Sequence, residues 1–202
     1  MRCITNLYNM LENKSKEFSQ SDESLIARHK TKLSSEMSLN QSKTTKWVIF
    51  DLDGTLADIE DRRIFAMNEY TNKMKWEVFF DPKNIKMDKP KTEVIMMVQA
   101  LKAFGYKIAI LSGRSKATKD ETKDWLNQYE VPYDILKLRP TGNKWKWMPD
   151  QKLKLGWFND LWVNDENKSE HEVIAVFDDR DKVVKMWREI GLTCMQVAPG
   201  NF

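Results

Sequence analysis

The chain has 202 residues, 33 of them basic and 30 acidic, so its formal net charge is +3 and gives no simple electrostatic argument for nucleic-acid binding beyond a local basic groove. Its two cysteines, Cys3 and Cys194, are too few for a disulfide framework and form no zinc pattern, which indicates a reduced cytosolic protein. No apolar run approaches the ~20 residues of a membrane helix, so we expect no membrane association.

The first 45 residues differ in composition from the rest of the chain. They contain no glycine or proline and many serines. Two helical pieces are plausible there. Ile4, Leu7, Tyr8 and Leu11 recur at helical spacing, and a thinner apolar stripe after the candidate N-cap Ser21 is formed by Leu25, Ile26, Leu33 and Met37. We therefore predict that residues 1–45 form an N-terminal arm, marginally helical or partly disordered, that carries no visible chemistry.

Residues 46–202 alternate between strand and helix patterns, and we expect them to form one domain. The apolar runs typical of buried parallel strands are Trp47–Phe50, Lys107–Leu111, Val173–Phe177 and, more weakly, Cys194–Val197. Helical patterns cover Glu93–Phe104, Lys116–Tyr129 and Lys182–Ile190. This alternation predicts an α/β fold with a central, mainly parallel sheet flanked by helices and with ligands at the carboxyl ends of its strands.

The first predicted strand is followed directly by Asp51-Leu-Asp-Gly-Thr55. Two carboxylates, those of Asp51 and Asp53, then lie close together, and Gly54 allows the chain to turn sharply. Such a pair can divide the work of nucleophile and acid/base, or it can bind a hard divalent cation. A surface turn with capping aspartates is the alternative.

Two later strands also end in polar residues. The second is followed by Ser112, Gly113 and Arg114, where a hydroxyl, free amides and a guanidinium suit a phosphate oxygen, although an ordinary turn has the same composition. The third is followed by Asp178 and Asp179, which repel each other and favour a cation between them. Capping of the next helix is the alternative there.

Lys152 and Lys154 precede the last of these motifs. A lysine at either position can pair with the acids or neutralise a phosphate. Each lysine taken alone is also typical of a solvated helix face. The residues by themselves do not show which lysine, if either, lies in the site.

The order of the four motifs resembles the haloacid dehalogenase superfamily of phosphotransferases. The resemblance covers about residues 46–202 and is strongest to the 3′-phosphatase domain of bacteriophage polynucleotide kinase/phosphatase. Arg62 follows Asp51 at the spacing of that family's substrate-binding arginine, and residues 132–139 are similar to its connecting segment. The resemblance implies a Rossmann-like fold, with only a minimal cap because the segment from Ile64 to Asp88 is too short for a full one.

The resemblance also implies a role for each motif residue. Asp51 is the nucleophile that forms an aspartyl-phosphate, Asp53 protonates the leaving oxygen and activates water, and Ser112 holds a phosphoryl oxygen. Lys154 neutralises the phosphate, with Lys152 as the alternative. Substrate contacts are expected from Thr55, Arg62, Gly113, Arg114 and Arg139. The Mg²⁺ ligands are expected to be Asp51, the main chain of Asp53, Asp178 and Asp179.

The function implied is Mg²⁺-dependent removal of a 3′-phosphate from DNA or RNA ends, in the cytoplasm, or in the host cytoplasm if the chain is of phage origin. A small-molecule phosphatase such as a nucleotidase and a non-catalytic module that binds phosphorylated ends are the alternatives. No Gly-Lys dipeptide occurs, so we expect no P-loop kinase in this chain.

Two further expectations concern the substrate. The arginines at 62, 114 and 139 are expected to contact phosphates that flank the terminal one, unless Arg62 pairs with Asp58 or Glu60. Tryptophans near the lysine motif can stack on bases. Packing is the more common role for such residues, which are Trp145, Trp147, Trp157 and Trp162.

Overall fold

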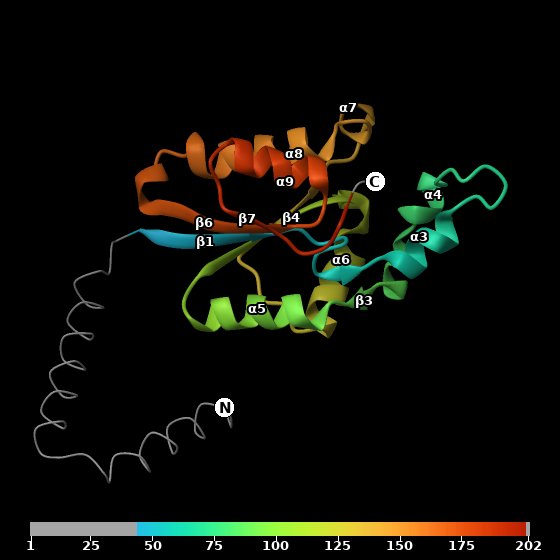
Figure 1. Ribbon diagram of the computed structural model, residues 1–202, viewed down its shortest axis with the longest axis horizontal. Helices are drawn as coiled ribbons and strands as arrows, with labels where there is room; N and C mark the ends of the chain where they lie inside the picture. Colours follow the sequence, from blue (N-terminus) through green and yellow to red (C-terminus); the bar gives the residue numbers. More distant parts are fainter. Residues whose placement is uncertain (1–43, 201–202) are drawn as a thin grey trace, which may run out of the picture. The chain divides into compact units, whose positions relative to one another are not determined.

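A five-stranded parallel sheet lies at the centre of residues 44–200, the part of the chain that the computed structural model describes (Figure 1). The strand order is β5-β4-β1-β6-β7. The strands are β1 (Thr45–Phe50), β4 (Lys107–Ser115), β5 (Ile135–Arg139), β6 (His171–Asp178) and β7 (Cys194–Gln196). The arm predicted for residues 1–45 lies almost wholly outside the described residues.

Helices cover both faces of this sheet, as Figure 1 shows. The longer ones are α5 (Thr92–Ala103), α6 (Lys119–Gln128), α8 (Asp150–Phe158) and α9 (Asp181–Glu189). The short ones are α3 (Glu60–Ala66), α4 (Trp76–Phe79) and α7 (Asn143–Lys146). Short 3₁₀ helices are η2 (Pro82–Met87), η3 (Lys116–Thr118) and η5 (Lys168–Glu170). Helix α8 runs on into a π-helical turn, η4 (Asn159–Val163).

The burial of β1 on both faces of the sheet explains why its sequence is continuously apolar and does not alternate with polar residues. Successive side chains of a strand point to opposite faces of the sheet. Val48 and Phe50 belong to the core cluster that includes residues of α5 and α6, whereas Trp47 and Ile49 belong to the cluster that includes residues of α8 and α9. Both faces are therefore buried, and each position must be apolar.

The predicted fold class and four predicted strands are confirmed, but the sequence analysis missed β5. Residues 132–139 were expected to be a connecting segment, yet Ile135–Arg139 pair in parallel with β4. The strand lies at the sheet edge and its residues are mostly half-buried, so charged side chains at Lys137 and Arg139 interrupt the apolar run. A pattern of this kind does not stand out from a loop.

A small insertion follows β1 and takes the place of a cap. Strands β2 (Ala57–Asp58) and β3 (Lys89–Pro90) pair antiparallel at its base. Between them, α3, α4 and η2 pack onto the α5–α6 core cluster through Ala66, Phe79 and Ile85. The minimal cap implied by the resemblance is thus anchored on the main core of the domain.

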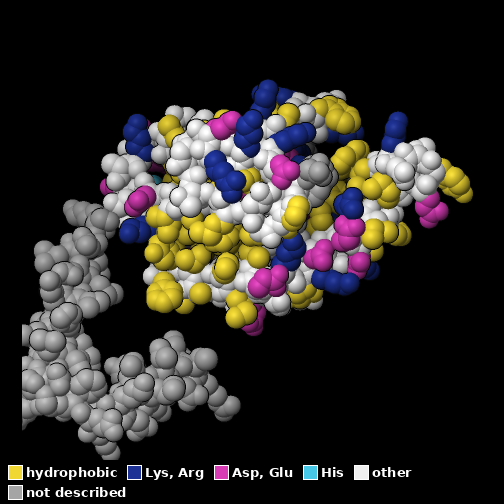
Figure 2. Space-filling view, viewed as in Figure 1, with side chains coloured by type: hydrophobic (Ala, Val, Ile, Leu, Met, Phe, Trp, Pro, Cys, Tyr) yellow, Lys and Arg dark blue, Asp and Glu magenta, His cyan; other side chains and the backbone are white. Residues whose placement is uncertain are grey.

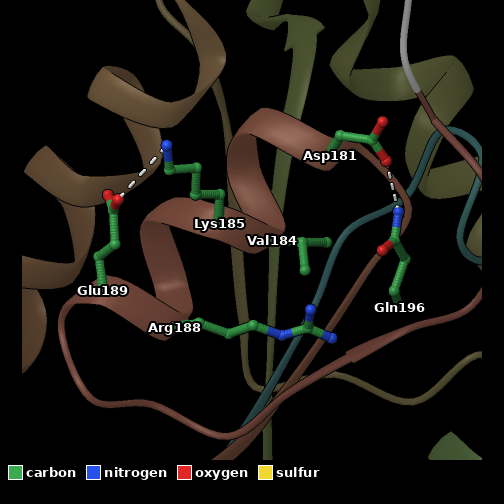
Figure 3. A pocket seen from close by; sticks show the side chains of 6 residues that line it. All are labelled: Asp181, Val184, Lys185, Arg188, Glu189 and Gln196. Atoms are coloured by element: carbon green, nitrogen blue, oxygen red, sulfur yellow. Dashed lines mark hydrogen bonds and ion pairs between the residues drawn. The ribbon is translucent and has the colours of Figure 1, made fainter.

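Strand β7 and helix α9 are held together at the far edge of the sheet (Figure 3). Gln196 donates from Nε2 to Asp181 Oδ1 over 2.7 Å, and Arg188 donates to the carbonyl oxygen of Cys194. The shallow depression between them is lined by side chains that already have partners, so we assign it a structural role. Within residues 44–200 no helix combines the length and the apolar character needed to cross a membrane.

Candidate active site

The polar motifs of three strands meet at one edge of the sheet. Phe50 of β1 lies in register with Ile110 of β4 and Phe177 of β6, so the residues that follow these three positions lie at the same edge of the sheet. The next residues bring Asp51 and Asp178 to that edge together with Ser112 of β4. A cavity of about 630 Å³ opens there and is lined by Asp51, Asp53 and Lys154 among others. The convergence is a consequence of parallel topology.

Lys154 is the charged centre of the site. Its Nζ donates to Asp51 Oδ1 over 2.6 Å and to Asp178 Oδ2 over 2.7 Å. It comes from α8 and is 2% exposed, whereas Lys152 is exposed to solvent on the same helix. The structure therefore selects Lys154 from the two lysines that the sequence left open.

Asp51, Asp178 and Asp179 form a buried acidic group. Each offers a carboxylate oxygen, and these oxygens lie within 4.8 Å of one another. Neither Asp178 nor Asp179 caps α9, because that helix has no side-chain cap at its N-terminus. The capping alternative is thus wrong, and the acids face the Asp51 side of the sheet edge instead.

Gly54 makes room for this acidic group. Its φ of +87° lies in the left-handed region, and a Cβ built there would lie 2.1 Å from Asp179 Oδ2. Thr55, which is fully buried, donates from Oγ1 to Asp179 Oδ1 over 3.4 Å. In this structure Thr55 holds Asp179, whereas the sequence analysis expected it to contact the substrate.

The charge balance of the acidic group fits a divalent cation. Burial raises the pKa of Asp51 well above its ordinary value, Lys154 opposes the shift, and Asp178 and Asp179 add to it. Burial and the neighbouring Asp178 also raise the pKa of Asp179 to about 6. Three carboxylates share one lysine, and hard oxygen ligands of this kind are those that Mg²⁺ prefers.

A second charged cluster holds Asp53. Its Oδ1 accepts from Arg62 Nη2 over 2.8 Å and from Arg114 Nε over 2.7 Å. Both arginines also bind Asp88, which accepts from Arg62 Nε over 2.7 Å and from Arg114 Nη2. Arg62 lies over the ring of Phe79 at 4.3 Å and donates to its carbonyl oxygen. We call Asp53, Arg62, Asp88 and Arg114 the arginine–aspartate cluster.

The two carboxylates of this cluster titrate in opposite directions. Burial alone would raise the pKa of Asp53, but Arg114 and Arg62 outweigh it and lower that pKa to about 2. Burial raises the pKa of Asp88 to about 6, with the repulsion of Asp53 adding to it and Arg114 opposing it. Near neutral pH both are ionised, and the cluster is electrically balanced.

This geometry differs from what was expected of Arg62 and Arg114. Each arginine is only 1% exposed, and each pairs with both Asp53 and Asp88 instead of extending into the solvent. The alternative partners of Arg62 are wrong too, because Glu60 pairs with Arg63 and Asp58 accepts from the main-chain nitrogen of Glu60. One donor of Arg114, Nη1, is buried without a partner in the described part of the chain.

Arg139 holds the segment that leads into α8. Its guanidinium donates to the carbonyl oxygens of Gly113, Trp145 and Met148 and pairs with Asp150. These contacts give no support to the expectation that Arg139 binds phosphates next to the terminal one. Gly113 lines the cavity, and a Cβ built on it would lie 2.8 Å from Asp150 Oδ1.

Ser112 is fully buried at the end of β4, and its Oγ accepts from the main-chain nitrogen of Arg114 over 3.2 Å. The sequence analysis gave no role to Asp88 or Asp150. Asp88 contacts Arg62 and Arg114 across 26 residues in each direction, so no local spacing signals it. Asp150 binds Arg139 and Arg180. Its position at the start of α8 is the only local feature that could have drawn attention to it.

Comparison with known proteins agrees with this arrangement. The family model of the polynucleotide kinase PNKP phosphatase domain matches residues 72–202. A protein of Autographa californica nuclear polyhedrosis virus, described as a bifunctional polynucleotide kinase/RNA ligase, is 31% identical over 150 residues, which are 73% of this chain and 18% of the viral protein.

Similar folds are found among solved structures. A chain of the Pnkp1/Rnl/Hen1 complex superposes with a TM-score of 0.62 at 32% identity, over 80% of this chain and 49% of that one. The haloacid dehalogenase-like hydrolase SP0104 of Streptococcus pneumoniae shares the fold, with a TM-score of 0.51 at 16% identity over 77% of this chain and 85% of its own. The chain thus spans about half of the chain from the Pnkp1/Rnl/Hen1 complex and about a fifth of the viral protein.

Proposed function

The chain belongs to the family of polynucleotide kinase PNKP phosphatase domains, which are phosphatases of the haloacid dehalogenase type, and we propose that it removes 3′-phosphates from nucleic-acid ends. The observation that carries the proposal is the buried contact of Lys154 with Asp51 and Asp178, at the floor of an open cavity. A carboxylate held in this way suits attack on phosphorus, because its position is fixed and a cation screens the incoming anion.

The proposed reaction has two steps. Asp51 attacks the phosphorus, the bond from phosphorus to the 3′ oxygen breaks, and that oxygen takes a proton from Asp53. Water then attacks the aspartyl-phosphate and gives a proton to Asp53, which releases inorganic phosphate and restores Asp51. Asp53 is ionised in the free site because its pKa is about 2. The negative charge of the entering phosphate raises that pKa, so the carboxylate takes up a proton from solvent as the substrate binds. The proton that Asp53 gains from water in the second step returns to solvent when inorganic phosphate leaves.

The acidic group and Lys154 prepare the site for an anionic substrate. We propose that Asp51, Asp178 and Asp179 hold Mg²⁺ together with the main-chain oxygen of Asp53. The ion, when bound, supplies positive charge to the phosphoryl oxygens. Lys154 opposes the rise in the pKa of Asp51 and orients its carboxylate, and Gly54 leaves the space that the carboxylate of Asp179 occupies.

The arginine–aspartate cluster positions the acid/base. Asp88 fixes both guanidinium groups, and these fix the carboxylate of Asp53. Nη1 of Arg114 is buried and has no partner among residues 44–200, so this donor would gain an acceptor from a phosphoryl oxygen. Arg114 is thus the member of the cluster that we propose as a substrate contact.

The nucleic-acid substrate rests on the relatives. Their descriptions name a polynucleotide kinase/RNA ligase and a complex of Pnkp1 with Rnl and Hen1. We propose by analogy that this domain acts on the same class of polymer end, as a step in strand repair. A nucleotidase would have the same floor of acids, so substrate preference separates the two functions.

The test is phosphate release from 3′-phosphorylated and 5′-phosphorylated oligonucleotides and from free nucleotides, with Mg²⁺ and with excess EDTA. We expect release from 3′-phosphorylated ends that stops in EDTA and returns with Mg²⁺. Asp51→Asn should lower turnover by roughly 10⁴ or more while the protein stays folded. The exposed Asp61→Asn is the control. Preference for free nucleotides would favour the nucleotidase, and activity in Asp51→Asn would refute the assigned nucleophile.

A further inference from the structure

One tryptophan beside the candidate active site is exposed without a packing reason. Trp157 and Trp162 are 9% and 7% exposed and belong to the core cluster on the α8–α9 face, which confirms packing for these two. Trp147 is 74% exposed and stands just after α7. Exposure alone does not mark a ligand site, since Phe104 is 83% exposed away from the cavity. Trp147 differs from Phe104 because it lines the cavity that holds the acids.

Trp147 lines the same cavity as the acids. A second tryptophan, Trp76 of α4, lines it from the small insertion and is 46% exposed. Trp76 is stacked on Phe80, with ring centroids 5.7 Å apart and planes 19° from parallel. In Figure 2, hydrophobic side chains gather over the α7 segment and over the α3–α4 lobe beside it. Two separate segments thus bring flat aromatic surfaces to one cavity.

Basic groups accompany the aromatic ones. Lys146 Nζ lies 5.1 Å from the ring centroid of Trp147, and both residues line the cavity together with Arg63. Aromatic faces beside cations suit a ligand that has both a π-face and phosphates, and nucleic acid has both. A simple phosphate ester would use the acids and the lysine but would leave the tryptophans in water.

We propose that Trp147 is the stacking platform for the base of the nucleotide that carries the terminal phosphate. Trp76 forms a further aromatic part of the lining. Lys146 and Arg63 line the same cavity and are the cations that we expect beside the adjoining backbone. This inference rests on the proposed function and adds where the polymer end lies. It predicts that the enzyme reads the presence of a terminal base, with little preference among bases, because every base has a π-face.

The test compares three substrates for each protein. They are an oligonucleotide with a natural 3′-phosphorylated terminal nucleotide, the same oligonucleotide with an abasic terminal residue, and glycerol 2-phosphate. The variants are Trp147→Ala and Trp147→Phe. The matched control is Phe104→Ala, because Phe104 is 83% exposed and does not line the cavity. Thermal unfolding checks that each variant is folded.

We expect Trp147→Ala to lower kcat/KM for the base-bearing end by about 5–150-fold, the equivalent of about 1–3 kcal/mol of stacking. Activity on the abasic end and on glycerol 2-phosphate should stay at the wild-type level. Trp147→Phe should recover most of the loss, and Phe104→Ala should change nothing.

The outcomes separate this inference from the function on which it rests. Equal losses on all three substrates, or a wild-type enzyme that treats natural and abasic ends alike, would overturn the stacking platform and leave the phosphatase proposal intact. A wild-type enzyme that hydrolyses glycerol 2-phosphate but neither oligonucleotide would overturn both.

Discussion

The arginine–aspartate cluster offers the sharpest test of how the tertiary structure prepares the site, through the substitution Asp88→Asn. Asp88 has a side chain without solvent exposure, and one of its oxygens binds Arg62 while the other binds Arg114. The amide of asparagine keeps one acceptor and places an NH₂ group against the other arginine. The substitution therefore leaves a buried guanidinium that faces a donor and has lost a counter-charge.

The size of the effect follows from that geometry. Breaking a buried ion pair on one side costs about 3–5 kcal/mol, because the remaining charge is uncompensated. For a domain of this size each kcal/mol lowers the melting temperature by about 2–4 °C, so we expect a decrease of about 6–20 °C. Asp53 loses the fixed positions of its two partners, and misplacement of a reacting group can cost on the order of 10²-fold in rate.

The assay combines thermal unfolding with phosphate release at about pH 8, where Asp88 is ionised because its pKa is about 6. Asp61→Asn is the matched control. It removes the same charge from an ion pair with Lys89, but these side chains are 51% and 69% exposed. Exposed pairs contribute about 0–1 kcal/mol, so the control should melt close to the wild type and keep its activity.

A positioning role also predicts which kinetic constant changes. Folded Asp88→Asn, measured below its melting temperature, should lose kcat more than it gains in KM, since Asp53 acts in the chemical step. The reasoning would be refuted if Asp88→Asn melted within about 1 °C of Asp61→Asn and kept the wild-type kcat. If Asp88→Asn lost stability but kept its kcat, Asp88 would have a structural role only.

Three further predictions concern other parts of the domain. Lys154→Met should lower the free energy of unfolding by about 3–5 kcal/mol in chemical denaturation, whereas Lys152→Met should not change it. Gly54→Ala should abolish the stabilisation of the protein by added Mg²⁺ in thermal unfolding, because its Cβ would lie 2.1 Å from Asp179 Oδ2. The pKa of Asp134 is lowered to about 2 because Lys102, the Ile108 amide and Lys107 outweigh its burial, so its stabilisation exists above about pH 4 and is lost as pH falls toward 2. Urea unfolding of Asp134→Asn should show a deficit of about 1 kcal/mol at pH 6 that shrinks on acidification, and a deficit independent of pH would contradict the assignment.

Much of the fold was visible in the sequence because it depends on local pattern. Apolar runs such as Trp47–Phe50 predict buried parallel strands, since both faces of the sheet must be covered. Motifs placed directly after such strands must meet at one edge of a parallel sheet. That reasoning correctly predicted that Asp51 and Asp178 lie together, and it needed no knowledge of side-chain contacts.

The sequence was less informative where a contact depends on burial or on distant partners. The edge strand β5 has charged residues at alternate positions, so its pattern is that of a loop. Lys152 and Lys154 have equivalent spacing, and only the packing of α8 against the sheet decides that Lys154 is buried and paired.

By itself, the sequence determined the α/β architecture and the set of acids at the strand ends, because hydrophobic periodicity and residue order are local properties of the chain. Only the tertiary structure decided the partners of those acids. Arg62 was expected to face the substrate and instead binds Asp53 and Asp88, because the insertion folds back and buries its guanidinium beside them. Likewise the structure leaves Trp147 74% exposed and Trp157 only 9% exposed. Exposure depends on what the rest of the chain covers, and no local pattern records it.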